Sequence, residues 1–154
     1  RFAASMIAIA IIPAIAEEYL FRGALQPLFA KWSGNIHVGV WASAILFSAI
    51  HFQFFGFIPR MLLGAGFGYL VVASGNIWTA ILCHFINNAS AVIAAYYLGS
   101  EWLETGLDPS SEPWGLSQML SIAIFAVVIW AIAKKLSAYS VWSKNESNYL
   151  ERGL

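Results

Sequence analysis

Six polar side chains interrupt the apolar stretches of this 154-residue chain: Glu17, Glu18, Arg22, His51, His84 and Asn88. A charge or an imidazole at membrane depth is costly, so such groups usually face a protein interior or a water-filled cavity. Two carboxylates, two imidazoles and an amide on separate apolar segments therefore indicate one shared polar site.

The acids Glu17 and Glu18 precede Arg22 on the first apolar segment. On a helix, Glu18 and Arg22 are i,i+4 neighbours and can form an ion pair. Glu17 projects about 100° away from Glu18, so Arg22 positions one carboxylate while the other stays free. Such a free carboxylate is suited to act as a general base. The alternative is that both acids mark a helix end and reach water.

The motifs that contain the two histidines also have structural explanations that involve no catalysis. His51 shares a helix face with Phe47, and a buried histidine bonded to a backbone carbonyl would explain it without chemistry. His84 shares a face with Asn88. An asparagine in a membrane helix often joins helices by hydrogen bonding, or it donates to a developing oxyanion in a catalytic site.

Two histidines and one glutamate also form a His₂Glu zinc set with an open water position. Its members here would be Glu17, His51 and His84. The chain contains no H-E-x-x-H motif, no G-x-S-x-G motif and no Walker-type phosphate loop. A zinc site and a metal-free carboxylate base both stay open at this point.

The elements that must position these groups are membrane helices. The chain is 60% hydrophobic and only 10% charged, whereas soluble domains carry roughly 25% charged residues. We therefore expect an integral membrane protein with an all-α, polytopic helix bundle. No basic face indicates a nucleic-acid partner. Five apolar segments predict about five transmembrane helices, at residues 2–21, 38–57, 61–73, 77–98 and 116–132, the third extending back through Pro59 if it spans the membrane.

Loops and charges divide the chain further. Polar or Gly- and Pro-containing breaks lie at 26–35, 56–60, 74–76 and 99–113. Residues 1–136 form the predicted membrane core and residues 137–154 a polar cytoplasmic tail. Lys134 and Lys135 place the C-terminus in the cytoplasm, and the acidic loop 99–113 lies outside.

The same count of basic residues orients the polar groups. It places Glu17 and His84 towards the cytoplasmic side, while Arg60 falls on the external side and is the exception to the charge rule.

In the third segment, Gly64-x-x-x-Gly68 is a pattern typical of close helix packing. We therefore expect Gly64, Gly66 and Gly68 to allow close packing of the third segment against a neighbouring helix.

Three motifs of the chain resemble, in order and spacing, those of the CPBP intramembrane endopeptidases, also called the CAAX prenyl protease type II, bacteriocin-processing or Abi family. They are Glu17-Glu18-x-x-x-Arg22, Phe47-x-x-x-His51 and His84-x-x-x-Asn88. The resemblance covers roughly residues 16–89. The family carries further helices before its first motif, so the resemblance implies a fragment of a longer protein.

The resemblance implies an intramembrane peptidase of a bacterial cytoplasmic membrane. Its substrate would be a membrane-associated peptide or protein, prenylated or bearing a leader, reached from the lipid bilayer. By the same resemblance Glu17 activates water with help from His51, and Arg22 holds Glu18.

The last motif would supply the electrophilic part of the site. The resemblance implies that His84 and Asn88 polarise the scissile carbonyl and stabilise the oxyanion. It leaves the cofactor undecided between a metal-free glutamate mechanism and zinc, bound by Glu17, His51 and His84.

Two other classes of protein would also keep polar residues in membrane helices. One is a non-catalytic bacteriocin self-immunity or scaffold protein, which would be expected to lack a motif residue, and none is missing here. The other is a transporter or proton relay, which would more often show inverted repeats or broken helices in matching halves. Neither feature is present in the sequence.

Overall fold

The computed structural model describes residues 2–52, 54, 56–98, 147–148 and 150–151 of the chain. Every described element is helical, and these residues contain no strand. The all-α prediction is therefore confirmed. The expected fifth helix at 116–132 and most of the tail at 137–154 lie outside the described residues.

The N-terminal rod, Phe2–Ser33, is one continuous helix of 32 residues. It comprises α1 (Phe2–Ser5), a π-type segment (Met6–Ile11), α2 (Ile12–Glu18), a second π-type segment (Tyr19–Leu25) and α3 (Gln26–Ser33). Pro13 and Pro27 each follow a π-type segment. A proline lacks the N–H of a regular helix and its ring crowds the carbonyl four residues back, and the wider turns accommodate both effects. The expected break over 26–35 is wrong, because the rod ends only at Gly34, where φ is +64°.

The helix α4 (Ile36–Ala49) is shorter than the expected second segment. The side chain of Asn35 caps its start by accepting hydrogen bonds from the backbone N–H groups of His37 and Val38. The helix ends well before the expected limit at residue 57. Phe52 adopts a left-handed backbone with φ +52°, which a right-handed helix cannot contain. His51 thus lies in a turn rather than on a helix.

Two further helices follow, α5 (Phe57–Ser74) and α6 (Ile77–Leu98). The first begins with Pro59 in its first turn, as the sequence allowed. Between the two helices lies Gly75, with φ +64°, a conformation that glycine adopts without steric cost. The bounds of α6 agree with the predicted segment 77–98.

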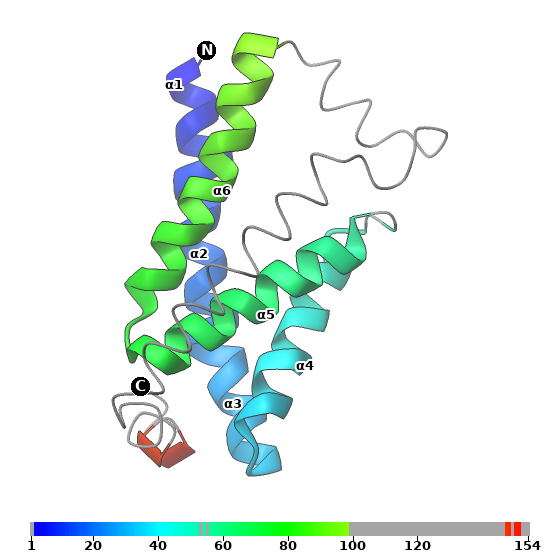
Figure 1. Cartoon of the computed structure of the whole chain (residues 1–154), viewed down its shortest axis with the longest axis vertical. Helices are drawn as coiled ribbons and strands as arrows, with labels where there is room; N and C mark the ends of the chain where they lie inside the picture. The colour runs from blue at the N-terminus through cyan, green and yellow to red at the C-terminus, as the bar shows by residue number, and fades with distance from the viewer. Residues whose placement is uncertain (1, 53, 55, 99–146, 149, 152–154) are drawn as a thin grey trace.

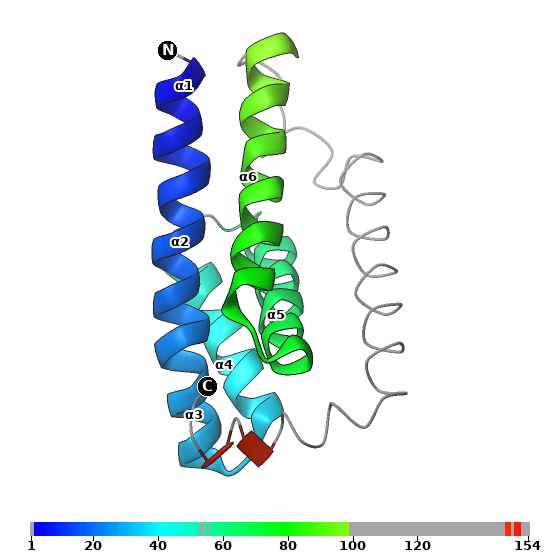
Figure 2. The same ribbon diagram turned by 90° about the vertical axis from the view of Figure 1, so that its left-hand side faces the viewer.

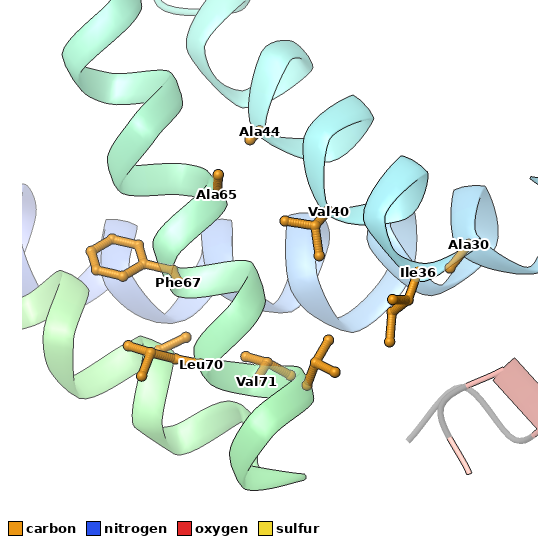
Figure 3. Packing of buried hydrophobic residues seen from close by; sticks show 10 residues of the cluster. Ala30, Ile36, Val40, Ala44, Ala65, Phe67, Leu70 and Val71 are labelled. Atoms are coloured by element: carbon orange, nitrogen blue, oxygen red, sulfur yellow. The ribbon is translucent and has the colours of Figure 1, made fainter. Parts of the chain in front are cut away.

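The helices pack as a small bundle. Figures 1 and 2 show α6 running antiparallel beside the N-terminal rod, while α5 crosses obliquely between α4 and α6. Figure 3 shows the apolar core where α3, α4 and α5 meet, with Val40, Ala44 and Ala65 facing one another. Small residues at these positions allow the helix backbones to approach closely.

Among the described residues, three helices are long and apolar enough to cross a membrane: Phe2–Ser33, Phe57–Ser74 and Ile77–Tyr97. Large apolar side chains such as Ile12, Leu82 and Ile86 lie more than half exposed on these helices. In a bilayer such side chains face lipid instead of water. Three of the polar residues singled out in the sequence, Glu18, Arg22 and His84, are instead buried inside the bundle.

Candidate active site

The buried ion pair between Glu18 and Arg22 forms the base of the site. Arg22 Nη1 lies 2.8 Å from Glu18 Oε1, and both side chains are almost completely buried. The other end of the guanidinium, Nη2, donates to the carbonyl of Gly64 at 2.8 Å. The i,i+4 pair predicted from the sequence is therefore present. It is also tied to α5, a contact that the sequence did not predict.

Two phenylalanines enclose this guanidinium. Arg22 Cζ lies 4.8 Å from the centre of the Phe47 ring and 5.6 Å from that of Phe67. A Cβ atom on Gly64 would stand 3.1 Å from Arg22 Nη2 and 3.2 Å from Phe47 Cδ1. Gly64 therefore has the packing role expected of it, because the absence of a side chain leaves room for Arg22 to reach the backbone of α5.

Gln26 continues the same polar row one turn further along the rod. Its Nε2 donates to the carbonyl of Gly68 at 3.2 Å, and the residue is completely buried. A Cβ atom on Gly68 would stand 2.5 Å from Gln26 Oε1. Gln26 was not among the predicted site residues, although its i,i+4 spacing from Arg22 places it on the same helix face. Arg22 and Gln26 together fix the register between the rod and α5.

His84 brings α6 to the two acids. Its Nδ1 lies 2.7 Å from Glu18 Oε1, and its Nε2 lies 3.8 Å from Glu17 Oε2. An ionised carboxylate only accepts hydrogen bonds, so Nδ1 carries the hydrogen and donates to Glu18. The imidazole also stacks on Phe67, with ring centres 5.5 Å apart. Glu18 and Phe67 therefore hold the ring so that Nε2 faces Glu17.

Glu17 is the accessible acid of the pair. Its side chain is 28% exposed, whereas that of Glu18 is buried. The 3.8 Å separation from His84 Nε2 is within reach of an ion pair but exceeds a hydrogen-bond length, so the ring does not hold Glu17 by a hydrogen bond. Arg60, in the first turn of α5, lies near enough to attract the charge of Glu17. One carboxylate is thus held in the interior while the other is accessible.

His51 is fixed by the helix that precedes it. Its Nδ1 lies 2.7 Å from the carbonyl of Phe47, and because a carbonyl only accepts, Nδ1 is the donor. The Phe47 ring contacts both imidazoles, with ring centres 5.0 Å from His51 and 6.0 Å from His84. The bond to a backbone carbonyl that the sequence left open for His51 is therefore present at Nδ1. This bond does not involve Nε2.

Asn88 points to the N-terminal rod. Its Nδ2 donates to the carbonyl of Ile9 at 3.1 Å, and its Oδ1 accepts from Asn87 Nδ2 at 3.2 Å. The structure therefore shows the helix-joining arrangement that the sequence left open for an asparagine. Such a contact uses one of the two N–H groups of the amide.

The expected zinc ligands do not converge in this arrangement. Within the described ranges of the chain, no three His, Cys, Asp or Glu side chains are grouped so that they could hold a metal ion. A His₂Glu zinc site needs three such ligands at about 2 Å from one ion. In the described residues, Glu17, His51 and His84 thus do not form a three-ligand site, and the zinc binding expected from the sequence is untested.

Residues 1–90 match the family model described as type II CAAX prenyl endopeptidase Rce1-like. The uncharacterized protein YpbD of Bacillus subtilis (strain 168) is 31% identical over an 88-residue alignment, which covers 54% of this chain and 42% of that relative. The aligned part thus spans less than half of the relative's length. No solved structure matches the chain. All six candidate residues lie inside the matched range.

Proposed function

Because the chain belongs to the Rce1-like family of type II CAAX prenyl endopeptidases, we propose that it forms the catalytic core of an intramembrane endopeptidase. The family is one of peptidases, and the apolar helices make the chain an integral membrane protein. The proposed reaction is hydrolysis of a peptide bond by water that Glu17 activates.

One observation carries this proposal. Glu18 and His84 are 66 residues apart in sequence, yet they share a buried hydrogen bond that turns His84 Nε2 towards Glu17. Glu18 and Phe67 orient the imidazole, and its 3.8 Å contact with Glu17 is longer than a hydrogen bond, so a reacting atom can sit against both groups. The ion pair with Arg22 and the stacking on Phe67 keep this geometry fixed.

The proposed mechanism uses these groups in turn. Glu17 takes a proton from water as the oxygen attacks the scissile carbonyl. His84, when protonated, donates from Nε2 to the oxyanion while Nδ1 stays on Glu18. Asn88 donates the N–H that Ile9 does not use to the same oxygen. As the tetrahedral intermediate collapses, Glu17 returns the proton to the leaving amine. His51 assists by accepting a hydrogen bond from the water at Nε2, since Phe47 holds its Nδ1.

The proposed substrate is a membrane-associated peptide or protein, prenylated or bearing a leader. It would approach the site from the bilayer on the cytoplasmic side, where we expect Glu17 and His84 to lie because of the distribution of Lys and Arg in the sequence. Membership of a CAAX endopeptidase family supports such a substrate. A farnesylated peptide that ends in Cys and three further residues is therefore the first probe to try.

The test uses the full-length protein in liposomes with that farnesylated peptide, and it follows product by mass spectrometry. We expect Glu17→Gln to lower kcat about 10²- to 10⁴-fold, the usual contribution of a general base, and His84→Ala to lower it strongly. His37→Ala is the matched control, because His37 is exposed and bonded to Tyr69. It should keep wild-type activity.

Two results would contradict the proposal. Normal cleavage by Glu17→Gln would exclude Glu17 as the base. If neither the peptide nor any protein of the native membrane were cleaved by the wild type and spared by Glu17→Gln, the site would be that of a non-catalytic membrane protein.

A further inference from the structure

Pro13 lies in the N-terminal rod, opposite a residue of the last motif. In a regular helix the N–H of residue 13 would donate to the carbonyl of Ile9, and proline has no N–H. The rod widens just before this point, where the N–H of Ile12 donates to the carbonyl of Ile7, five residues back. Pro13 therefore cannot supply the donor that the Ile9 carbonyl has in a regular helix.

Asn88 donates to this same carbonyl. Its Nδ2 lies 3.1 Å from Ile9 O, across 79 residues of sequence. In membrane helices, side chains of neighbouring helices commonly satisfy the backbone groups that a proline frees. The second bond of the amide, from Asn87 to Asn88 Oδ1, fixes which end of the side chain faces the rod. The amide is thus held from both ends, one turn of α6 beyond His84.

We propose that Pro13 is a positioning residue of the active site, because it provides the carbonyl acceptor that orients the amide of Asn88. The remaining N–H of that amide is then presented in a fixed direction to the substrate. This inference rests on the proposed function, in which Asn88 contacts the oxyanion. The same contact also sets the distance between α6 and the rod, so two independent measurements can test it.

The first measurement is kinetic and uses the full-length protein in liposomes with the farnesylated peptide. In Pro13→Ala, the new N–H competes for the Ile9 carbonyl and the rod returns towards a regular helix. We expect kcat to fall about ten- to a hundredfold, as for a misplaced catalytic group, with KM changed less than about twofold. Adding Pro13→Ala to Asn88→Ala should lower kcat no further, because the orienting contact no longer has an amide to orient.

Pro27→Ala is the matched control. Pro27 also follows a π-type segment of the rod, where the N–H of Gln26 donates to the carbonyl of Phe21. The carbonyl four residues before Pro27 is that of Gly23, and Gly23 lies beside Ile77 rather than beside a residue of the last motif. Removing this proline should leave kcat within about twofold, which separates the loss of one specific acceptor from the general straightening of the rod.

The second measurement does not depend on catalysis. Equilibrium unfolding in mixed micelles gives the effect of Asn88→Ala in two backgrounds. It should lower the folding equilibrium constant about three- to twentyfold in the wild type, the usual range for a hydrogen bond between membrane helices. In the Pro13→Ala background the effect should be less than about twofold.

The outcomes separate the two proposals. Equal effects of Asn88→Ala in both backgrounds would overturn the role of Pro13, and so would wild-type kcat in Pro13→Ala or a further loss of kcat in the double variant. If the wild type cleaves no probe, the proposed function fails for that substrate, and the unfolding comparison still decides whether Pro13 provides the acceptor for Asn88.

Discussion

Removal of Arg22 should destabilise the bundle more than removal of Arg22 and the Glu18 charge together. Arg22→Met leaves the Glu18 carboxylate buried without a cation. Glu18→Gln combined with Arg22→Met leaves no charge, while the amide oxygen that replaces the carboxylate can still accept from His84. The comparison tests whether the buried pair is the reason that these two residues tolerate the apolar interior.

The magnitude follows from the contacts of Arg22. Leaving one partner of a buried pair uncompensated costs about 3–5 kcal/mol. Arg22→Met also loses the bond to the Gly64 carbonyl, about 1 kcal/mol, and the contacts with Phe47 and Phe67, about 1 kcal/mol. The first cost disappears in the double variant. We expect it to be more stable than Arg22→Met by at least about 2 kcal/mol.

The assay is equilibrium unfolding of the purified protein in mixed micelles, followed by circular dichroism of its helices. Glu151→Gln is a suitable control, because this described residue is exposed and exposed charges contribute little. A double variant that is as unstable as Arg22→Met, or less stable, would refute the reasoning. The instability would then come from lost contacts of the guanidinium rather than from a stranded carboxylate.

Two further predictions concern the glycines and the metal. Gly68→Ala should destabilise the protein by about 1–3 kcal/mol, since its Cβ would meet Gln26 Oε1 at 2.5 Å. Gly23→Ala, whose Cβ meets only the flexible end of Ile77 at 3.3 Å, should be neutral or stabilising in the same unfolding assay. Because no three potential ligands are grouped in the described residues, we expect elemental analysis of the purified protein to give less than about one zinc per chain. Stoichiometric zinc that is lost in His84→Ala would contradict this prediction.

Parts of the fold could be predicted because the sequence marks them clearly. The bounds of α6 follow from the turn residues Gly75 and Asn76, which separate two apolar runs. The N-terminal rod could not be predicted as one helix, because Pro27 normally indicates an end and local sequence does not show a π-type turn. The early end of α4 also escaped prediction, since an apolar run continues through a left-handed Phe52.

The contacts of the site also differ in whether local sequence can predict them. The contact between Glu18 and Arg22 is local, and the i,i+4 spacing predicted it. His84 with Glu18 and Asn88 with Ile9 join residues 66 and 79 positions apart, and only the packing of α6 on the rod determines them. The spacing of His84 and Asn88 placed them on one helix face, and the structure shows the partner of each on the rod. Their joint action on a substrate stays a prediction.

The short α4 has a consequence for the surrounding lipid. Its 14 residues rise about 21 Å, against a hydrocarbon thickness of about 30 Å. In Figures 1 and 2, α4 and α5 meet well short of the level that α6 reaches. The helix α4 is therefore shorter than the hydrocarbon layer, and local thinning of the bilayer is one response to such a mismatch. The membrane beside His51 would then be thinner than elsewhere, and its thickness would set how far water and a lipid-anchored chain travel to reach Glu17.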